Sequence, residues 1–370
     1  MLAIQGVGLR GLQAPEGPLD MGNSGTGMRL LLGILAGQSF STLLTGDDSL
    51  SRRPMDRIAQ PLGLMGISVE GQGERCTPPL TIHGGRPRAI DYHSPMPSAQ
   101  VKSAVMLAGL YADGVTSVTE PALSRDHTER MLRAFGAEVT TGLTAEGRPA
   151  ASVLGGPSLQ GQAVAVPGDF SSAAYPLAAA LLCPGSEVTI HGVIINPTRA
   201  GLLDVLRRMG AQVAVSDSWD EAGELVGDAR AMHSGLEGTS VSGAEIPCLI
   251  DEVPLLSVLA TQAEGTTVIR DAQELRVKES DRLALTARGL VSMGANVEEL
   301  PDGLIIEGPT PLRGAQIDAA HDHRIAMSFA IAGLVADGET AITGAETIAT
   351  SFPEFAETMR ALGASLATTG

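Results

Sequence analysis

The stretch AQVKSAVMLAGLYADGVTSVTEPALSRDHTERMLRAFGAEV, residues 99–139, contains the unit from which the fold can be predicted. It begins with an apolar run of small residues that ends at Gly114, and the β-rich piece TSVTE follows. A second helical pattern then ends at Gly136. Because the first run is apolar nearly all round, it predicts a helix that is buried on every side.

The second pattern, residues 127–136, is amphipathic. Met131, Leu132 and Phe135 are predicted to share its buried face, and Glu129 is predicted to point away from that face. The closing glycine is typical of a left-handed residue that ends a helix. Strand residues follow, so the unit reads as helix, strand, helix and strands.

Both patterns recur along the chain. The apolar run has five copies, which end at Gln38, Gly114, Gly185, Gly265 and Gly338, at intervals of 76, 71, 80 and 73 residues. The amphipathic pattern also has five copies, and these end at Gly66, Gly136, Gly210, Gly294 and Gly363. Two markers that keep one period indicate a true repeat. Such units around shared buried helices, with sheets outside, predict a globular α/β fold.

The domain organisation follows from the position of the Gly-rich stretch 141–167, which contains strand signals and turns but no helical pattern. Two complete units precede this stretch and three follow it. We therefore expect an N-terminal domain at 1–165 and a C-terminal domain at 166–370, with the crossing near 164–168. The first residues, IQGVGLRGL at 4–12, are similar to the closing strand of a unit, which predicts that roughly one repeat of about 70 residues is missing before them.

Composition excludes several classes of partner. The 370 residues include 25 Lys and Arg against 42 Asp and Glu, a net charge of −17, which disfavours nucleic acid and anionic lipid as partners. No apolar stretch reaches the roughly 18 to 20 residues of a membrane span, and the N-terminus lacks the order of a signal peptide. Cys76, Cys183 and Cys248 have neither disulfide nor zinc spacing, so we expect a cytoplasmic protein with reduced thiols.

Polar residues collect where the predicted helices begin. The loop LDMGNSGTGMRL, 19–30, enters a helix through Asn23, Ser24 and Gly25, where a ligand could approach the backbone, although an ordinary capped turn has the same composition. Ahead of another helix, Arg53 suits bidentate contact with a phosphate or carboxylate, and the alternative is a solvated arginine.

The stretch PSAQVK, 97–102, places Ser98 and Gln100 at a helix start, where Ser98 could bind a substrate, cap the helix, or do both. In LSRDH, 123–127, Ser124 and Arg125 are further candidate ligands, and Asp126 is predicted to cap the next helix.

The C-terminal half contains the charged candidates. Asp251 and Glu252 stand directly before an apolar helix, a position that a helix dipole alone would also favour. Lys278, Glu279 and Arg282 lie together in ELRVKESDRL, where a solvated ion-pair face is the alternative. Arginines at the same loop position in other units favour a binding site.

The stretch HDHRIAMSF, 321–329, begins an apolar helix with Asp322, His323 and Arg324. Aspartate and histidine suggest metal binding. Here, however, they do not form a pair of ligands at helical spacing, and the arginine would repel a cation. We therefore expect no metal here.

In this order on this repeat, six motifs resemble the 5-enolpyruvylshikimate-3-phosphate (EPSP) synthase family: LDMGNSGTGMR, RRPMDR, PSAQVKSA, VKESDR, DHRIAM and TSFPEF. The resemblance covers nearly the whole chain. It implies a two-domain inverse α/β barrel of βαβαββ units, with five of the usual six present. It also implies transfer of the enolpyruvyl group of phosphoenolpyruvate to the 5-hydroxyl of shikimate 3-phosphate, with release of phosphate and without a metal or organic cofactor.

The resemblance also implies roles for single residues. The ligands that it implies for shikimate 3-phosphate are Ser98, Ala99, Gln100, Arg125, Asp251 and Lys278. Those that it implies for phosphoenolpyruvate are Gly25, Arg53, Gln100, Arg282 and Arg324. Asp251 is similar to the proton acceptor at the 5-hydroxyl, Lys278 contacts the same substrate region, and Glu279 resembles an acid that helps to protonate the methylene carbon. A carboxylate pair with separated pKa values suits this proton traffic.

The chain departs from the family pattern at two places. The N-terminal Gly-Asp-Lys-Ser motif has no counterpart before Asp20, and Asp48 stands where its echo GDDSLSRR would need the lysine. Thr350 stands where some members have a lysine. We expect apolar surface left exposed by the missing unit to favour a homodimer or low stability. A non-catalytic or fragment-dependent phosphate-binding protein is the alternative function.

Two related families share the repeat. UDP-N-acetylglucosamine enolpyruvyl transferases usually carry a cysteine six residues before the Arg-Pro proline, where this chain has Asp48, and VKESDR and DHRIAM favour the shikimate branch. RNA 3′-phosphate cyclases would need a nucleic-acid partner, which the net charge of −17 disfavours.

Overall fold

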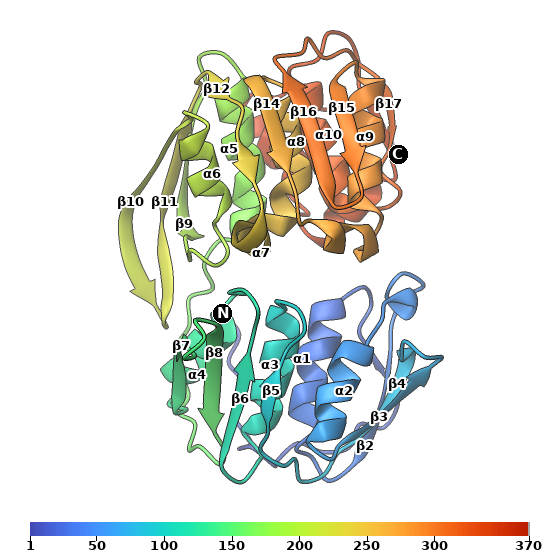
Figure 1. Ribbon diagram of the computed structural model, residues 1–370, viewed down its shortest axis with the longest axis vertical. Coiled ribbons are helices and arrows are strands. Elements are labelled where there is room, and N and C mark those ends of the chain that lie inside the picture. The colour runs from blue at the N-terminus through green and yellow to red at the C-terminus, as the bar shows by residue number, and fades with distance from the viewer. Residues whose placement is uncertain (369–370) are drawn as a thin grey trace. The chain divides into compact units, whose positions relative to one another are not determined.

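A computed structural model describes residues 1–368, and in it the chain divides into two compact units. The first unit contains Met1–Ala165 together with Ala222–Glu224, and the second contains Val166–Glu221 and the chain from Leu225 onward. Each unit combines helices and sheets around its own hydrophobic core, which confirms the α/β class (Figure 1).

The first unit contains two copies of one supersecondary motif. The first copy consists of β1 (Leu19–Asp20), α1 (Gly25–Leu35), β2 (Ser41–Thr45), η1 (Leu50–Arg52), α2 (Asp56–Leu64), β3 (Ser68–Gln72) and β4 (Thr77–His83). The second consists of β5 (Asp91–His93), α3 (Ala99–Gly109), β6 (Val115–Thr119), α4 (His127–Ala134), β7 (Val139–Leu143) and β8 (Pro149–Leu154).

The two sheets of this unit have the same topology. Their strand orders are β1-β2-β4-β3 and β5-β6-β8-β7. In both, the first strand pairs in parallel with the second, and the remaining neighbours pair antiparallel. A parallel pair needs a crossover, which α1 or α3 supplies, and a short turn suffices for the antiparallel hairpin. The repeat predicted from the glycine spacing is therefore a repeat of structure.

The second unit contains three copies. The first consists of α5 (Phe170–Leu182), β9 (Glu187–Ile194), α6 (Leu202–Arg208), β10 (Gln212–Glu221) and β11 (Glu224–Met232). The second consists of β12 (Leu236–Glu237), β13 (Ser240–Val241), η2 (Gly243–Glu245), α7 (Ile246–Leu249), η3 (Ile250–Glu252), α8 (Val253–Ala260), β14 (Ala263–Ile269), η4 (Gln273–Val277), α9 (Arg282–Ser292), β15 (Asn296–Leu300) and β16 (Gly303–Gly308). The third consists of β17 (Gln316–Asp318), α10 (His323–Gly333), β18 (Ala341–Thr343), η5 (Ala345–Thr350) and α11 (Phe355–Ala361).

The sheets of the second unit repeat the same pairing. β12 and β13 run parallel to β14, and β16 pairs antiparallel with both β14 and β15. β11 pairs antiparallel with β9, and a parallel bridge from Gly168 to Val193 takes the place of the first strand. β17 and β18 form a parallel pair.

The glycines that close the amphipathic helices confirm the predicted caps. Gly66, Gly136, Gly210, Gly294 and Gly363 have φ angles of 88°, 90°, 78°, 91° and 99°. This left-handed conformation is strained for a residue with a Cβ atom, so glycine is the residue that suits it. Each amphipathic helix therefore ends in the same way.

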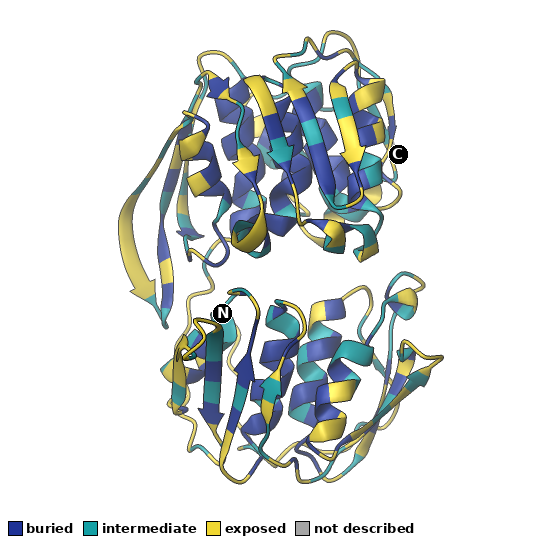
Figure 2. Ribbon diagram, in the orientation of Figure 1, coloured by how far each residue is buried: buried dark blue, intermediate teal, exposed yellow. Residues whose placement is uncertain are grey.

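The first helix is largely buried in four of the five copies, as the sequence predicts (Figure 2). The exception is α1, in which Thr26 is exposed and Leu30, Leu31 and Ile34 are only partly buried. Every residue of α8 is buried, and α5 is buried along nearly its whole length. Small residues allow this packing: α1 lies against α3, and a Cβ atom on Gly33 would stand 2.4 Å from the Ala104 carbonyl oxygen. A larger side chain at Gly33 would force the two helices apart.

Two local expectations are wrong. Residues 1–18 form no strand, and Ile4 and Val7 are exposed, because a strand is stable only where neighbouring backbone groups pair with it. In α4, Leu132 is buried but Met131 is 47% exposed, whereas Glu129 is 1% exposed. The α3 residue Lys102 lies 2.8 Å from the Glu129 carboxylate, and this opposite charge makes its burial tolerable.

Candidate functional site

The first unit holds one cluster of predicted site residues at the N-terminus of α1. Ser24 caps this helix, because its Oγ accepts a hydrogen bond from the Gly27 N–H at 3.0 Å. Gly25 follows directly. A Cβ atom on Gly25 would stand 3.0 Å from Nη1 of Arg29 and 3.2 Å from Nη1 of Arg53. Two guanidinium groups therefore lie against the helix start, where the helix dipole already favours an anion.

Arg53 is held in place by the loop before α1. Its Nη2 donates to the Asn23 Oδ1 at 2.9 Å and to the Ser49 Oγ at 3.3 Å. Asn23 in turn donates through Nδ2 to Asp47 at 2.7 Å. Arg52, by contrast, is exposed. Hydrogen bonds to Asn23 and Ser49 thus fix the Arg53 guanidinium beside Gly25.

Gln100 connects α3 to the same cluster. Its Oε1 accepts a hydrogen bond from Nη1 of Arg29 at 2.8 Å, and its Nε2 donates to the Thr26 hydroxyl at 2.6 Å. Arg29 is only 5% exposed and also donates to the Pro54 carbonyl oxygen. The structure therefore brings Gly25, Arg53 and Gln100 together, and Arg29 joins them.

The start of α3 carries the next predicted residues. Ser98 caps α3 through its Oγ, Ala99 is the first helical residue, and both lie next to Gln100 in the chain. Arg125 is half-buried in the loop before α4. Asp126 stands at the N-cap position of α4 as predicted, but its carboxylate makes no cap hydrogen bond and accepts from Nε of Arg130 at 2.8 Å.

The second unit holds a cluster centred on Asp251. Its carboxylate oxygens lie 3.3 Å from Nη1 of Arg199, 3.3 Å from Nη1 of Arg282 and 3.9 Å from Nζ of Lys278. Nη2 of Arg324 is also 3.9 Å away. Asp251 lies in the single turn η3 that leads into the buried helix α8, so the fold places it where four basic side chains converge.

Arg282 is the most deeply buried of these cations, with 1% exposure. It donates through Nη2 to Glu279 at 2.7 Å and through Nε to Asp322 at 2.8 Å. Burial disfavours its charge, but the Asp322 and Glu279 carboxylates overcome this effect and raise the pKa of Arg282. Arg282 therefore joins the segment before α9 to the start of α10.

Arg324 lies in the first turn of α10 and donates through Nη1 to the Asp251 carbonyl oxygen at 3.2 Å and to Glu252 at 3.3 Å. Glu252 is 2% exposed and also accepts a hydrogen bond from the Ser171 hydroxyl. Burial would lower the pKa of Arg324, but Asp251 raises it well above its ordinary value, so the group stays charged. Close by, burial raises the pKa of Tyr175 to about 12.

Two basic residues of these clusters were missed by sequence reasoning. Arg29 follows the expected glycine loop by one helical turn, so it shares a face with Gly25. Arg199 stands just before α6, at the position where other copies carry Arg53, Arg125 and Arg282. That repeated loop position was the signal that could have identified it.

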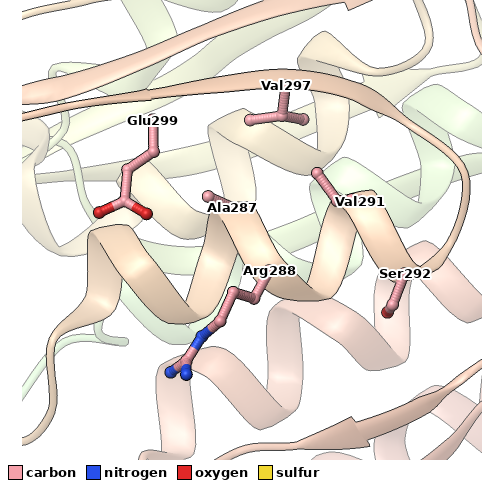
Figure 3. A pocket seen from close by; sticks show the side chains of 6 residues that line it. All are labelled: Ala287, Arg288, Val291, Ser292, Val297 and Glu299. Carbon is pink, nitrogen blue, oxygen red and sulfur yellow. The ribbon is translucent and has the colours of Figure 1, made fainter.

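The described residues offer few other sites. Among them no group of three or more His, Cys, Asp or Glu side chains could hold a metal ion. No helix within 1–368 is long and apolar enough to cross a membrane. A shallow hollow between α9 and β15 is lined by Ala287, Arg288, Val291, Ser292, Val297 and Glu299, none of which is a predicted site residue (Figure 3).

Comparison with known proteins identifies similar sequences over almost the full chain. A profile of the family described as EPSP synthase (3-phosphoshikimate 1-carboxyvinyltransferase) matches residues 3–359. A 3-phosphoshikimate 1-carboxyvinyltransferase of Desulforamulus reducens is 53% identical over 359 residues, which cover 97% of this chain and 82% of that protein. One from a Synechococcus strain is 54% identical over 360 residues, covering 97% of this chain and 80% of that protein.

Solved structures agree with these sequence matches. An EPSP synthase from Acinetobacter baumannii superposes with a TM-score of 0.84 at 48% identity, over 97% of this chain and 81% of that chain. The enolpyruvyl transferase NikO from Streptomyces tendae has a TM-score of 0.73 at 22% identity, over 92% of this chain and 76% of that one, and this likeness shows the fold alone.

Proposed function

Because the chain belongs to the EPSP synthase family, we propose that it transfers the enolpyruvyl group of phosphoenolpyruvate to the 5-hydroxyl of shikimate 3-phosphate and releases inorganic phosphate. This step belongs to the shikimate pathway of aromatic amino-acid biosynthesis. The observation that carries the proposal is the convergence of Arg199, Lys278, Arg282 and Arg324 on Asp251. Such a group of cations suits substrates that carry several negative charges.

For shikimate 3-phosphate we propose the helix start of α3 as a phosphate site. Ser98 offers its hydroxyl, Ala99 its backbone N–H, and Gln100 its amide. Arg125, from the loop before α4, would supply the positive charge. Asp251 and Lys278 are the residues that we assign to the region of the 5-hydroxyl.

For phosphoenolpyruvate we propose Gly25, Arg53, Gln100, Arg282 and Arg324. Gly25 supports this assignment, because the missing side chain leaves the N-terminus of α1 approachable beside two guanidinium groups. Arg53 supports it as well, because hydrogen bonds to Asn23 and Ser49 hold its guanidinium beside Gly25, and a guanidinium group suits a phosphate or carboxylate.

We assign the proton transfers to Asp251 and Glu279. Asp251 would accept the proton of the 5-hydroxyl as the oxygen attacks C2 of phosphoenolpyruvate, while the methylene carbon gains a proton with the help of Glu279. Collapse of the tetrahedral adduct breaks the C2–O bond to phosphate and returns a proton from the methyl group. Both carboxylates contact Arg282, with distances of 3.3 and 2.7 Å, so one buried cation holds them near each other.

Nothing in the comparisons favours the non-catalytic alternative. The relatives are biosynthetic enzymes, which supports our proposal of a cytoplasmic location. A homodimer stays a prediction: Met1, Leu2, Ile4 and Val7 expose large apolar side chains, and light scattering that finds only a monomer would contradict it.

Phosphate release by the purified chain tests the proposed reaction. We expect steady turnover when both phosphoenolpyruvate and shikimate 3-phosphate are present, and none when either is left out. Asp251→Asn, purified in the same way, is the control against a contaminating enzyme, because it should lower the rate of phosphate release at least about a hundredfold. Absence of turnover with the wild-type chain and both substrates would overturn the proposal.

A further inference from the structure

A buried group of three charges lies beside the proposed phosphate site, among residues that no role above uses. Nζ of Lys102, on α3, lies 3.0 Å from the Glu120 carboxylate and 2.8 Å from the Glu129 carboxylate. The side chains of all three residues are at most 3% exposed. Burying one cation with two carboxylates is costly, so a gain in stability alone does not account for this group.

Hydrogen bonds distinguish the two carboxylates. Glu120 accepts from the Ser98 backbone N–H at 2.8 Å through one oxygen, and from the Ser124 hydroxyl at 2.8 Å through the other. Lys102 also donates to the Ser124 carbonyl oxygen at 3.3 Å. Glu129 also contacts Lys102, but neither Ser98 nor Ser124 donates a hydrogen bond to it.

We propose that Glu120 is a positioning residue for shikimate 3-phosphate. Its two oxygens join the start of α3 at Ser98 to the loop at Ser124, and Arg125 follows directly in the chain. The two segments that carry the proposed phosphate ligands are thus fixed to one buried carboxylate. This inference rests on the proposed function, whose substrate it concerns.

The charge state of the group supports this role. Burial alone would lower the pKa of Lys102, but Glu129 and then Glu120 raise it above its ordinary value, so the ammonium group keeps its proton. A charged Lys102 holds the Glu120 carboxylate in place while that carboxylate accepts from Ser98 and Ser124. The positioning device is therefore a cation, a carboxylate and two serines.

Glu129 provides a matched control. Glu120→Gln and Glu129→Gln each remove one charge from the same buried group, next to the same lysine. A glutamine at position 120 has one acceptor oxygen, and an NH₂ group replaces the other oxygen. That NH₂ group would face either the Ser98 N–H, or Lys102 and the Ser124 hydroxyl, and these are the groups that donate to Glu120. At position 129 the amide oxygen can still accept from Lys102. Only Glu120→Gln should therefore disturb the hydrogen bonds of Ser98 and Ser124.

The experiment compares the steady-state kinetics of the two variants. For Glu120→Gln we expect the KM for shikimate 3-phosphate to rise about tenfold, as when a hydrogen bond to a charged group is lost. The KM for phosphoenolpyruvate and kcat should stay within about threefold of the wild type, because the contacts of Arg53 and Asp251 do not involve Glu120. For Glu129→Gln all three constants should stay within about threefold.

Equal effects of the two variants, or an equal rise of both KM values in Glu120→Gln, would overturn the inference, because a general loss of packing would act in that way. Turnover by the wild-type chain is measured in the same experiment. Its absence would reject the proposed function, whereas a failure confined to the comparison of the variants would reject only the positioning role of Glu120.

If Glu120→Gln does not fold, Ser124→Ala removes only the hydroxyl that donates to Glu120. It should raise the KM for shikimate 3-phosphate about threefold and leave that for phosphoenolpyruvate unchanged. An unchanged KM for shikimate 3-phosphate in Ser124→Ala would contradict the proposed positioning.

Discussion

Gly25 and Arg53 lie so close together that a Cβ atom on Gly25 would stand 3.2 Å from Nη1 of Arg53. The same atom would stand 3.0 Å from Nη1 of Arg29. The absence of a side chain at this one position therefore allows two guanidinium groups to approach the N-terminus of α1. An added methyl group would have to displace one of them or occupy the space of a bound anion.

We expect Gly25→Ala to raise the KM for phosphoenolpyruvate by about tenfold, because the methyl group would weaken a charge-assisted contact. The KM for shikimate 3-phosphate should change less. Gly63→Ala is a suitable control, since Gly63 lies in α2 and a Cβ atom there would meet nothing within 4 Å. An unchanged KM for phosphoenolpyruvate in Gly25→Ala would remove this glycine from the proposed site.

We expect Asp251→Asn to lower kcat by roughly 10²- to 10⁴-fold, the usual contribution of a general base. Binding of shikimate 3-phosphate, measured by titration calorimetry, should persist, because the variant removes a negative charge from beside Arg199, Arg282 and Arg324. The exposed Asp204 offers the control Asp204→Asn. Turnover by Asp251→Asn at the wild-type rate would exclude Asp251 as the base.

Arg199→Met should destabilise the chain by about 1.5–3 kcal/mol, because it removes charge-assisted hydrogen bonds to two carboxylates. Arg199 is 8% exposed and lies 3.0 Å from Asp169 and 3.3 Å from Asp251. Urea unfolding measures the change in the free energy of unfolding. In the control Arg207→Met, where the side chain is 46% exposed, the change should stay below about 1 kcal/mol. Similar losses in both variants would contradict the structural role of Arg199.

The stability of the chain should depend on Asp322 in acid. Burial disfavours its charge, but Arg282 and the hydrogen bonds from Arg282 and Ser280 hold the pKa of Asp322 below its ordinary value of 3.8. Below that value the unfolded chain binds a proton at this position while the folded chain does not. The stabilisation is therefore present above pH 3.8 and is lost as the pH falls through the lower folded pKa.

Urea unfolding between about pH 5 and pH 3 can detect this loss. In Asp322→Asn the fall of the free energy of unfolding with pH should be shallower than in the wild type, by at most about 1.4 kcal/mol per pH unit. Parallel curves for the two proteins would show that Asp322 does not titrate differently in the folded and unfolded chain.

Much of the fold could be predicted because its signals are local. The left-handed glycines at Gly66 and Gly294 mark helix ends by their own backbone preference, and the buried helices are apolar all round. The cluster around Asp251 could also be predicted in part, because Lys278 and Arg282 stand where an amphipathic helix begins, and Asp251 and Arg324 stand where apolar helices begin.

The errors concern interactions between segments that lie far apart in the sequence. The sequence predicts Glu129 to be a solvent-facing residue of an amphipathic helix, and only the position of Lys102 on α3 explains its burial. Arg199 has no motif of its own, and its contacts with Asp169 and Asp251 depend on how α5, α6 and α8 pack. Helical periodicity contains no information on such partners.

The left-handed glycine after each amphipathic helix restricts where the repeat can change in length. It ends the helix within one residue, and in four copies a strand begins two or three residues later. Between Gly210 and Gly294 the interval grows to 84 residues, and this growth falls in the long β10–β11 hairpin and in the η2–α7 segment before α8. Within this chain the copies therefore differ in length at their hairpins and connecting turns, while the residues that end the amphipathic helices are uniform.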